Sequence, residues 1–297
     1  MPELPEVETV RARLAPALVG RRFAHVDIHD PRLTRPFDPA AVAAALEGER
    51  VSEVGRRGKY LVVGFESGRS LLIHLRMTGS IRHAEPGTIA DDPYRRAVVK
   101  LDDGSDVVYR DVRRFGTWLL VEPGELEPYL AARLGGEPLA RTFTSRRLAD
   151  RLRHRRAPIK AALLDQRTLA GMGNIYVDEA LWRARIHPLR PAHELAAEEV
   201  ALLTRGIKDA LRAGIARQGA TLRDYSTPDG RRGRMQETFK VYGRTDEPCP
   251  RCGTPIEKTR VAGRGTWYCP HCQQRAGRYA ASRASSRPSR SRRQSSV

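Results

Sequence analysis

The sequence has no apolar run approaching the roughly 18 residues that a membrane-spanning helix needs, and no signal peptide precedes its acidic start. We therefore expect a soluble, cytoplasmic protein without a membrane partner. Cysteine is absent outside residues 249–272, a distribution that disfavours a disulfide framework and is typical of one local metal site in a reducing compartment. Acidic residues are absent after Glu257.

The remaining composition is strongly basic. The 297 residues include 53 Lys and Arg against 35 Asp and Glu, which gives a net charge of +18. Such a charge points to a polyanionic partner, and nucleic acid is the first candidate, with an anionic membrane surface as the alternative. The chain is long enough for two domains with substantial cores.

The first six residues, Met1-Pro2-Glu3-Leu4-Pro5-Glu6, carry the main chemical signal. Removal of Met1 leaves Pro2 with a secondary amine, which can attack a carbon electrophile and form an iminium cation. An unperturbed α-amino group has a pKa of about 8, so part of it is neutral near pH 7. Glu3 places a proton donor or acceptor beside this amine. The alternative is an ordinary Met-Pro start with acids in a first helical turn.

The first half of the chain predicts one helix followed by short strands. The spacing of Val7, Val10, Leu14 and Leu18 predicts a helix over Pro5–Leu18. Alternating apolar residues and turn signals predict a β-sandwich or flattened barrel beyond it. The expected strands are Phe23–Ile28, Tyr60–Phe65, Leu71–Leu75, Val98–Leu101, Val107–Tyr109 and Thr117–Val121. Leu126–Arg141 is interpreted as the connection between two domains.

The second half is predicted to be helical. After the basic segment Arg146–Arg156, short helices over Pro158–Arg167 and Ile175–Arg185 flank a glycine-rich turn, in a helix–turn–helix arrangement. A longer amphipathic helix carries Val200 to Ile215 and ends near Gly219. Residues 221–236 are interpreted as an exposed loop. The Arg- and Ser-rich residues 276–297 are interpreted as a disordered basic tail, capable of salt-sensitive attraction to phosphate.

The cysteine spacing is the strongest single motif. Cys249 and Cys252 are separated from Cys269 and Cys272 by sixteen residues, as in a structural zinc site with four thiolate ligands. All four ligand positions are filled, so one structural Zn²⁺ is expected. Two disulfides or an iron centre are the alternatives. Lys258, Arg260 and Arg264 lie between the pairs, as in a β-hairpin that presents cations to phosphate.

Several motifs occur together in one order. They are the first nine residues, Met1 to Thr9, then Arg57-Gly58-Lys59-Tyr60, His74-Leu75-Arg76-Met77-Thr78-Gly79, Arg113-Arg114-Phe115-Gly116, Gly173-Asn174-Ile175-Tyr176 and the four cysteines. With these motifs the chain resembles the formamidopyrimidine-DNA glycosylase family over roughly residues 1–275. The resemblance implies an α+β multidomain fold: an N-terminal helix plus β-sandwich, a helix-two-turn-helix domain and a C-terminal four-cysteine zinc finger.

The resemblance implies a role for each catalytic candidate. Pro2 would attack C1′ of the deoxyribose, and Glu3 would protonate the sugar ring oxygen. Lys59 and Arg264 would stabilise charge, contact phosphate and donate protons during elimination. Glu6 and Glu179 would help to position the amine and its water. Without the resemblance, Lys59 could be an ordinary exposed strand lysine, and the two glutamates routine helix acids.

The resemblance also implies the DNA-binding residues. Met77, Arg113 and Phe115 would fill the gap left by a base rotated out of the duplex, and Arg114 lies within the same motif. The alternative is that Met77 and Phe115 are core residues.

Lys160 and Asn174 would contact the DNA backbone, although an Asn that opens a helix is most often an N-cap. The loop 221–236 would close over the flipped base, and we assign no base contacts within it.

We predict a bifunctional DNA glycosylase and abasic-site lyase of base excision repair, acting as a monomer at the bacterial nucleoid on oxidised purines in duplex DNA. The alternatives are an endonuclease VIII-like enzyme for oxidised pyrimidines, which typically has Gly in place of Leu4, and a non-catalytic zinc-finger binder of damaged DNA. The expected domains are 1–135, 136–240 and 241–275, followed by the tail 276–297.

Overall fold

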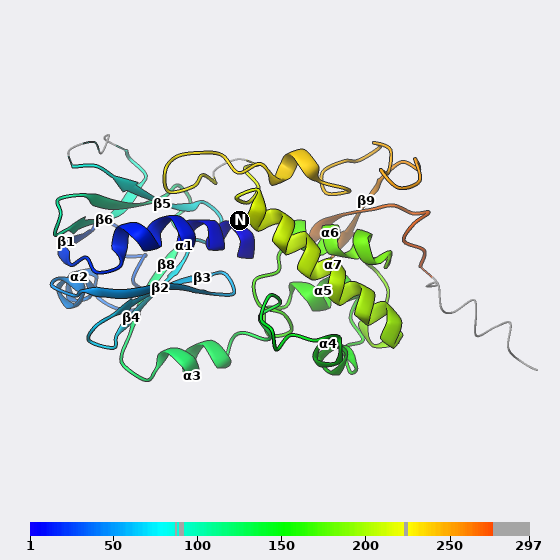
Figure 1. Cartoon of the computed structure of the whole chain (residues 1–297), viewed down its shortest axis with the longest axis horizontal. Coiled ribbons are helices and arrows are strands. Elements are labelled where there is room, and N and C mark those ends of the chain that lie inside the picture. Colours follow the sequence, from blue (N-terminus) through cyan, green and yellow to red (C-terminus); the bar gives the residue numbers. More distant parts are fainter. Residues whose placement is uncertain (87, 89–91, 223–224, 276–297) are drawn as a thin grey trace, which may run out of the picture.

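The computed structural model describes residues 1–86, 88, 92–222 and 225–275. The predicted tail 276–297 and residues 223–224 of the predicted loop lie outside them. A β-rich half and a helical half lie side by side, and the N-terminus is at the junction between them (Figure 1). The predicted α+β organisation is confirmed.

The β-rich half is a sandwich of two four-stranded antiparallel sheets, ordered β1-β6-β7-β5 and β2-β3-β4-β8. Short runs rich in apolar and β-branched residues, separated by turn residues, explain why six of these strands could be predicted. The sequence analysis missed β2 and β5, which are rich in charged or small residues, and helix α2. The bounds are β1 Phe23–Ile28, α2 Pro39–Leu46, β2 Val51–Arg57, β3 Tyr60–Phe65, β4 Ser70–His74, β5 Gly79–Ala84, β6 Arg95–Leu101, β7 Asp106–Asp111 and β8 Thr117–Val121.

Helix α1 (Leu4–Leu18) connects the two halves. Its predicted apolar stripe, from Val7 to Leu18, is buried in the core of the sandwich. Leu4, one turn earlier, belongs instead to the core of the helical half. The residues preceding the helix are therefore held between two packed cores, which is where a precisely placed amino terminus could be maintained.

The helical half contains α4 (Ser145–Leu152), α5 (Ile159–Leu164), α6 (Asn174–Ala184) and α7 (Ala197–Ala216). Leu148 and Leu152 bury one face of α4, so part of the predicted basic segment is a core helix. Helix α5 ends before the predicted Arg167, because Asp165 has an extended conformation. The predicted connection contains a short helix, α3 (Leu126–Ala131).

The finger follows as an antiparallel hairpin of β9 (Glu257–Val261) and β10 (Arg264–Tyr268), as predicted. The interpretation of residues 221–236 as an exposed loop is wrong for several residues. Thr221 and Thr227 are buried, and Tyr225 packs into the sandwich core. Among the residues that the structure describes, no helix is both long and apolar enough to cross a membrane.

Candidate active site

Glu3 is buried at the start of helix α6. The backbone N–H groups of Ile175 and Tyr176 donate to its two carboxylate oxygens at 3.0 and 3.3 Å. A helix N-terminus stabilises such an anion. Burial nevertheless raises the pKa of Glu3, with the nearby Lys59 opposing the rise. A carboxyl group with a raised pKa keeps its proton closer to neutrality, as a general acid requires.

Gly173 makes this arrangement sterically possible. A Cβ at Gly173 would lie 2.2 Å from the carboxyl carbon of Glu3. The glycine before α6 therefore provides the space that Glu3 needs to reach the helix N-terminus.

Glu6 joins α1 to two other parts of the chain. Its Oε2 accepts a hydrogen bond from the backbone N–H of Glu3 at 2.9 Å. Its Oε1 accepts from the Tyr176 hydroxyl and from the backbone N–H of Ala220, both at 2.8 Å. Glu6 is thus no routine solvent-exposed helix acid, because it fixes the backbone next to Pro2.

Lys59 lies in the tight turn between β2 and β3 and is only 5% exposed to solvent. The alternative of an ordinary exposed strand lysine is therefore wrong. Burial lowers the pKa of Lys59, while the carboxylates of Glu3 and Glu6 counteract this. Glu137, from the connection between the halves, accepts hydrogen bonds from the Gly58 backbone N–H and from Arg56, and so holds this turn.

His74 is a buried neighbour that the sequence analysis did not single out as a site residue. Its Nδ1 accepts a hydrogen bond from the Arg76 backbone N–H at 3.0 Å. Burial, with repulsion from Arg76 and Lys59, lowers the pKa of His74 to about 3. The ring is consequently neutral at physiological pH and leaves the local positive charge to Lys59 and Arg76.

Pro2 lines a cavity of about 360 Å³. Met77 and Arg113 come from the sandwich side, and Leu222 and Tyr242 come from the segments after α7. This cavity brings together the predicted nucleophile, two of the three predicted wedge residues and the predicted capping loop, while Phe115 is not part of its lining. Its volume lies in the range of small-ligand pockets, which suits a single flipped base.

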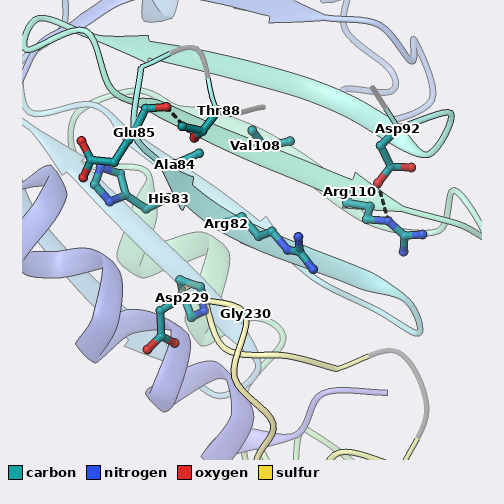
Figure 2. A pocket seen from close by; sticks show the side chains of 11 residues that line it. Arg82, His83, Ala84, Glu85, Thr88, Asp92, Val108, Arg110, Asp229 and Gly230 are labelled. Atoms are coloured by element: carbon teal, nitrogen blue, oxygen red, sulfur yellow. Dashed lines mark hydrogen bonds and ion pairs between the residues drawn. The ribbon is translucent and has the colours of Figure 1, made fainter. Parts of the chain in front are cut away.

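A second cavity, of about 350 Å³, lies between β5 and the segment Pro228–Gly230. Figure 2 shows its charged lining, with Arg110 paired to Asp92 at 2.6 Å and Asp229 across from the sheet. Its lining contains neither Pro2 nor the buried acid Glu6, which both line the first cavity. The cavity at Pro2 is therefore the candidate active site.

The predicted wedge residues stand on two adjoining turns and are not core residues. Phe115 is 50% exposed, and the Arg113 guanidinium lies 4.8 Å from its ring centroid. Met77 is only partly buried. Buried Asp111 holds the turns together, because its carboxylate accepts from the Thr78 hydroxyl and from the Gly116 backbone N–H. The sequence analysis missed Asp111.

Arg114, predicted to lie at the DNA-binding surface, is paired with a carboxylate of the protein itself. Its guanidinium donates twice to the buried carboxylate of Asp30, at 2.6 and 2.8 Å. This bidentate pair lowers the pKa of Asp30. Arg114 thus braces the turn that carries Phe115, and we leave it out of the DNA-binding surface.

Lys160 is a second correction, because its side chain is completely buried (0% exposed). Its ammonium forms an ion pair with Asp178 at 2.7 Å and donates to the Gly265 carbonyl at 2.9 Å. A buried, paired ammonium does not present its charge to a DNA backbone. Burial raises the pKa of Asp178 to about 7 against the attraction of Lys160.

Asn174 is the first residue of α6 and not its N-cap, which is Gly173. The Asn174 side chain donates from Nδ2 to the Gly265 carbonyl at 2.9 Å. Arg264, the adjacent hairpin residue, is exposed. Its positive charge reaches Lys59, whose pKa it helps to lower.

Glu179 is fully buried in α6 and binds the segment that leads into the finger. Its Oε1 accepts hydrogen bonds from the backbone N–H groups of Lys240, Val241 and Tyr242, at 2.8, 2.9 and 3.2 Å. The predicted role beside the amine is therefore replaced by an anchoring role for the segment that leads into the finger. The sequence spacing from Pro2 could not reveal this contact.

The four cysteines converge as predicted. Their Sγ atoms all lie within 4.8 Å of one another. A tetrahedral zinc with Zn–S bonds of about 2.3 Å requires sulfur atoms at such spacings. The Trp182 indole N–H donates to Cys249 Sγ at 3.4 Å and supports this ligand from α6. The donor set fits one structural Zn²⁺, as expected.

Comparisons with known proteins agree with this geometry. Residues 1–118 match the formamidopyrimidine-DNA glycosylase N-terminal domain, residues 134–226 its H2TH domain, and residues 246–275 the zinc finger found in FPG and IleRS. The chain is 46% identical over 275 residues to formamidopyrimidine-DNA glycosylase of Roseiflexus sp. (strain RS-1), covering 92% of this chain and 100% of the relative. The relative from Chloroflexus aggregans is 48% identical over 274 residues, 92% and 98% of the two chains.

Solved structures agree as well. A complex of a Lactococcus lactis FPG mutant with DNA containing Fapy-dG superposes with a TM-score of 0.86 at 38% identity, covering 92% of this chain and 100% of that one. MutM bound to DNA containing carbocyclic 8-oxo-G gives 0.85 at 38% identity, with the same coverage.

The sandwich, the H2TH helices and the cysteine finger, arranged around a buried Pro2, define a class of DNA-repair glycosylases. Within that class, the chain belongs to the formamidopyrimidine-DNA glycosylase family. The predicted family and fold are confirmed.

Proposed function

We propose that Pro2, freed by removal of Met1, is the nucleophile of a bifunctional DNA glycosylase and abasic-site lyase. The enzyme removes oxidised purines, namely 8-oxoguanine and formamidopyrimidines, from damaged duplex DNA in base excision repair. The observation that carries the assignment of Pro2 is its position on the wall of the cavity, next to the buried acid Glu3.

In the proposed chemistry, the Pro2 nitrogen lone pair attacks C1′ and the bond from C1′ to the base breaks. The nitrogen loses its proton, which the departing base takes up. Glu3 then gives its proton to the sugar ring oxygen as the bond from C1′ to that oxygen breaks, and the nitrogen lone pair forms the C1′ iminium. The iminium acidifies the hydrogens on C2′. Loss of a C2′ proton expels the 3′ phosphate, and a second elimination expels the 5′ phosphate. Water then hydrolyses the iminium and restores the amine.

The protein environment favours these steps at several atoms. The raised pKa of Glu3 keeps its carboxyl group protonated closer to neutral pH. Buried Lys59 and exposed Arg264 supply positive charge near the leaving phosphates. Lys59 is also a candidate proton donor, because burial lowers its pKa.

Binding of the damaged duplex is assigned to Met77, Arg113 and Phe115, with Arg264 on the phosphates. The exposed Phe115 ring can stack at a base step, and the Arg113 guanidinium can pair with the orphaned base. Residues 221–236 are assigned to covering the flipped base, since Leu222 and Tyr225 line the cavity.

We further propose that the enzyme is a monomer in the bacterial cytoplasm, associated with the nucleoid through its DNA substrate. The domain division at residues 135, 240 and 275 remains a proposal. It is supported by three hydrophobic clusters centred on the sandwich, the helical half and the finger, although Leu4, Tyr225 and Trp182 pack across the divisions.

The test is borohydride trapping on duplex DNA containing 8-oxoguanine opposite cytosine. Reduction should convert the iminium into a stable adduct that peptide mapping assigns to Pro2. A protein that keeps an N-terminal extension should bind the duplex and form no adduct. An adduct on another amine, or normal turnover by the extended protein, would overturn the assignment.

A further inference from the structure

Three side chains of the helical half converge on one short stretch of the finger hairpin. Lys160 and Asn174 both donate to the Gly265 carbonyl, each at 2.9 Å. Asp178 accepts from the Trp267 backbone N–H at 3.0 Å. The ion pair between Lys160 and Asp178, at 2.7 Å, joins the two sides of this contact. We call these three residues the hairpin clamp.

Both charged members of the hairpin clamp are fully removed from solvent. Burying an ion pair costs desolvation free energy that the mutual attraction often fails to repay. A pair of apolar residues could fill the same space with equal or greater stability. The pair is better explained by what it holds, namely the backbone of residues 265–267 through directed hydrogen bonds.

The residue next to this stretch is Arg264, the first residue of β10 after the hairpin turn. Its side chain is exposed, and its charge acts on both Lys59 and Lys160. Because the carbonyl of Gly265 is fixed from two sides, the backbone that carries Arg264 has little freedom to move away from Lys59.

The finger is attached to α6 independently at its other end. The Arg251 guanidinium lies 4.0 Å from the Trp182 ring centroid and donates to the Trp182 carbonyl. Gln273 donates from Nε2 to the Ile186 carbonyl at 2.9 Å. The zinc ligands therefore do not depend on the hairpin clamp for their attachment, and the clamp is left to determine where the hairpin tip lies.

We propose that Asp178, acting through Lys160 and the Trp267 backbone, is a positioning residue that places Arg264 over the reaction centre for strand cleavage. The proposal rests on the proposed role of Arg264 in the elimination steps. It makes a specific claim, since Asp178 should matter only as long as Arg264 is present.

The test is a double-mutant cycle of Asp178→Asn and Arg264→Ala. Single-turnover cleavage of a duplex with a preformed abasic site isolates the lyase steps, and zinc content and duplex affinity are measured on each protein. We expect Asp178→Asn to slow cleavage about 10-fold in the wild-type background and less than about twofold in the Arg264→Ala background. Asp209→Asn, an exposed acid-to-amide change on α7, is the matched control and should have no effect.

Equal fold losses in the two backgrounds would overturn the positioning role, because Asp178 would then act by another route. Wild-type cleavage by Arg264→Ala alone would overturn the role of Arg264 in the proposed function, and the positioning proposal with it. These two failures are distinguishable. Failure of the Arg264 role appears in the Arg264→Ala variant alone, whereas failure of the positioning role appears only when Asp178→Asn is compared in the two backgrounds.

A folding defect would show as lost zinc in Asp178→Asn, which leaves Lys160 buried without its partner. In that case the apolar double variant Lys160→Met with Asp178→Leu keeps the volume and removes both charges. We expect it to retain zinc and to show the same Arg264-dependent loss. Loss of zinc in this variant too would contradict the independent attachment of the finger and overturn the proposal.

Discussion

Two regions meet at the cavity and differ sharply in burial: the amino-terminal centre, meaning Pro2, Glu3 and Glu6, and the predicted wedge of Met77, Arg113 and Phe115. Pro2 and Glu6 line the cavity from the first region, and Met77 and Arg113 from the second. Glu3 is 3% exposed and receives hydrogen bonds from the start of α6, whereas Phe115 is 50% exposed on a turn of the sandwich. Both regions are nevertheless rigidly supported, Glu3 by a helix N-terminus and Phe115 by the turn that Asp111 and Arg114 hold.

The difference reflects what each region must do. Proton transfer and charge stabilisation gain strength where water is excluded and groups are fixed beforehand. A side chain that inserts into a base stack must instead stay exposed to solvent until DNA binds. Substitutions in the centre should therefore affect reaction steps most, whereas those in the wedge should affect lesion recognition with little change in stability.

The largest effect is expected for Glu3→Gln, which removes the proton donor while preserving shape. Base excision should fall about 10²- to 10⁴-fold, the range for loss of a general acid. The wild-type rate should decline as pH rises through the raised pKa of Glu3, because the ionised carboxylate cannot donate. The variant should lack this decline. Single-turnover pH profiles test both points, with exposed Glu198→Gln as the control, and an unchanged profile would remove Glu3 as the acid.

A smaller but still large effect is expected for Gly173→Ala. The added Cβ would overlap the Glu3 carboxyl group and displace it from the α6 N-terminus. A displacement of about 1 Å can reduce the rate about 100-fold. Gly55→Ala is the matched control, since the atoms around a Cβ there lie at 3.9 Å or more. Equal rates for the two variants would show that Glu3 does not need its present position.

Phe115→Ala should change the free energy of unfolding by no more than about 0.5 kcal/mol, because the ring is half exposed. Base excision from duplex DNA should fall about 10-fold, the lower end of what a base–aromatic stack contributes. Phe37→Ala provides a control on the sandwich with nearly equal exposure, 51%. Wild-type excision by Phe115→Ala would remove Phe115 from the wedge.

No effect on base excision is expected from the last change, at His74, which should alter only stability in acid. Its pKa is lowered from 6.5 to about 3 in the folded protein, so the unfolded chain binds more protons between these values. Stability should therefore be retained above pH 6.5 and fall with decreasing pH, by at most about 1.4 kcal/mol per pH unit. His74→Asn should reduce this dependence in urea unfolding between pH 6.5 and 4.5. The change His154→Asn, at an exposed histidine, is the control and should not reduce this dependence. Equal slopes of the free energy of unfolding against pH in both variants would contradict the prediction.

Much of the fold was predictable because the signals are local. The apolar stripe of α1, three strands with correct bounds and the finger hairpin all follow from short-range periodicity and turn residues. The missed strand β2 ends in Gly55-Arg56-Arg57 and shows why such prediction stops. Charged residues occupy a strand there because Arg56 pairs with Glu8 and Glu137, which are distant in sequence.

The sequence predicted which residues belong to the candidate site, but not which contacts they make. The sequence identified Pro2, Glu3, Lys59 and the finger through motifs, yet it assigned Lys160 and Arg114 to DNA although each has a buried carboxylate partner. It assigned Glu179 to the amine although Glu179 holds residues 240–242. No local pattern distinguishes a cation or acid that meets DNA or water from one that meets a distant side chain.

By itself, the sequence determined the candidate reactive groups and the metal ligands, because Pro2 with the acids after it and the four-cysteine spacing are covalent features of the chain. Tertiary structure alone decided the burial of Glu3 against Ile175 and the attachment of Glu6 to Ala220. It also brought together the hairpin clamp beside Arg264. Those contacts join residues far apart in the chain, and desolvation and steric fit, which exist only after folding, determine their protonation and position.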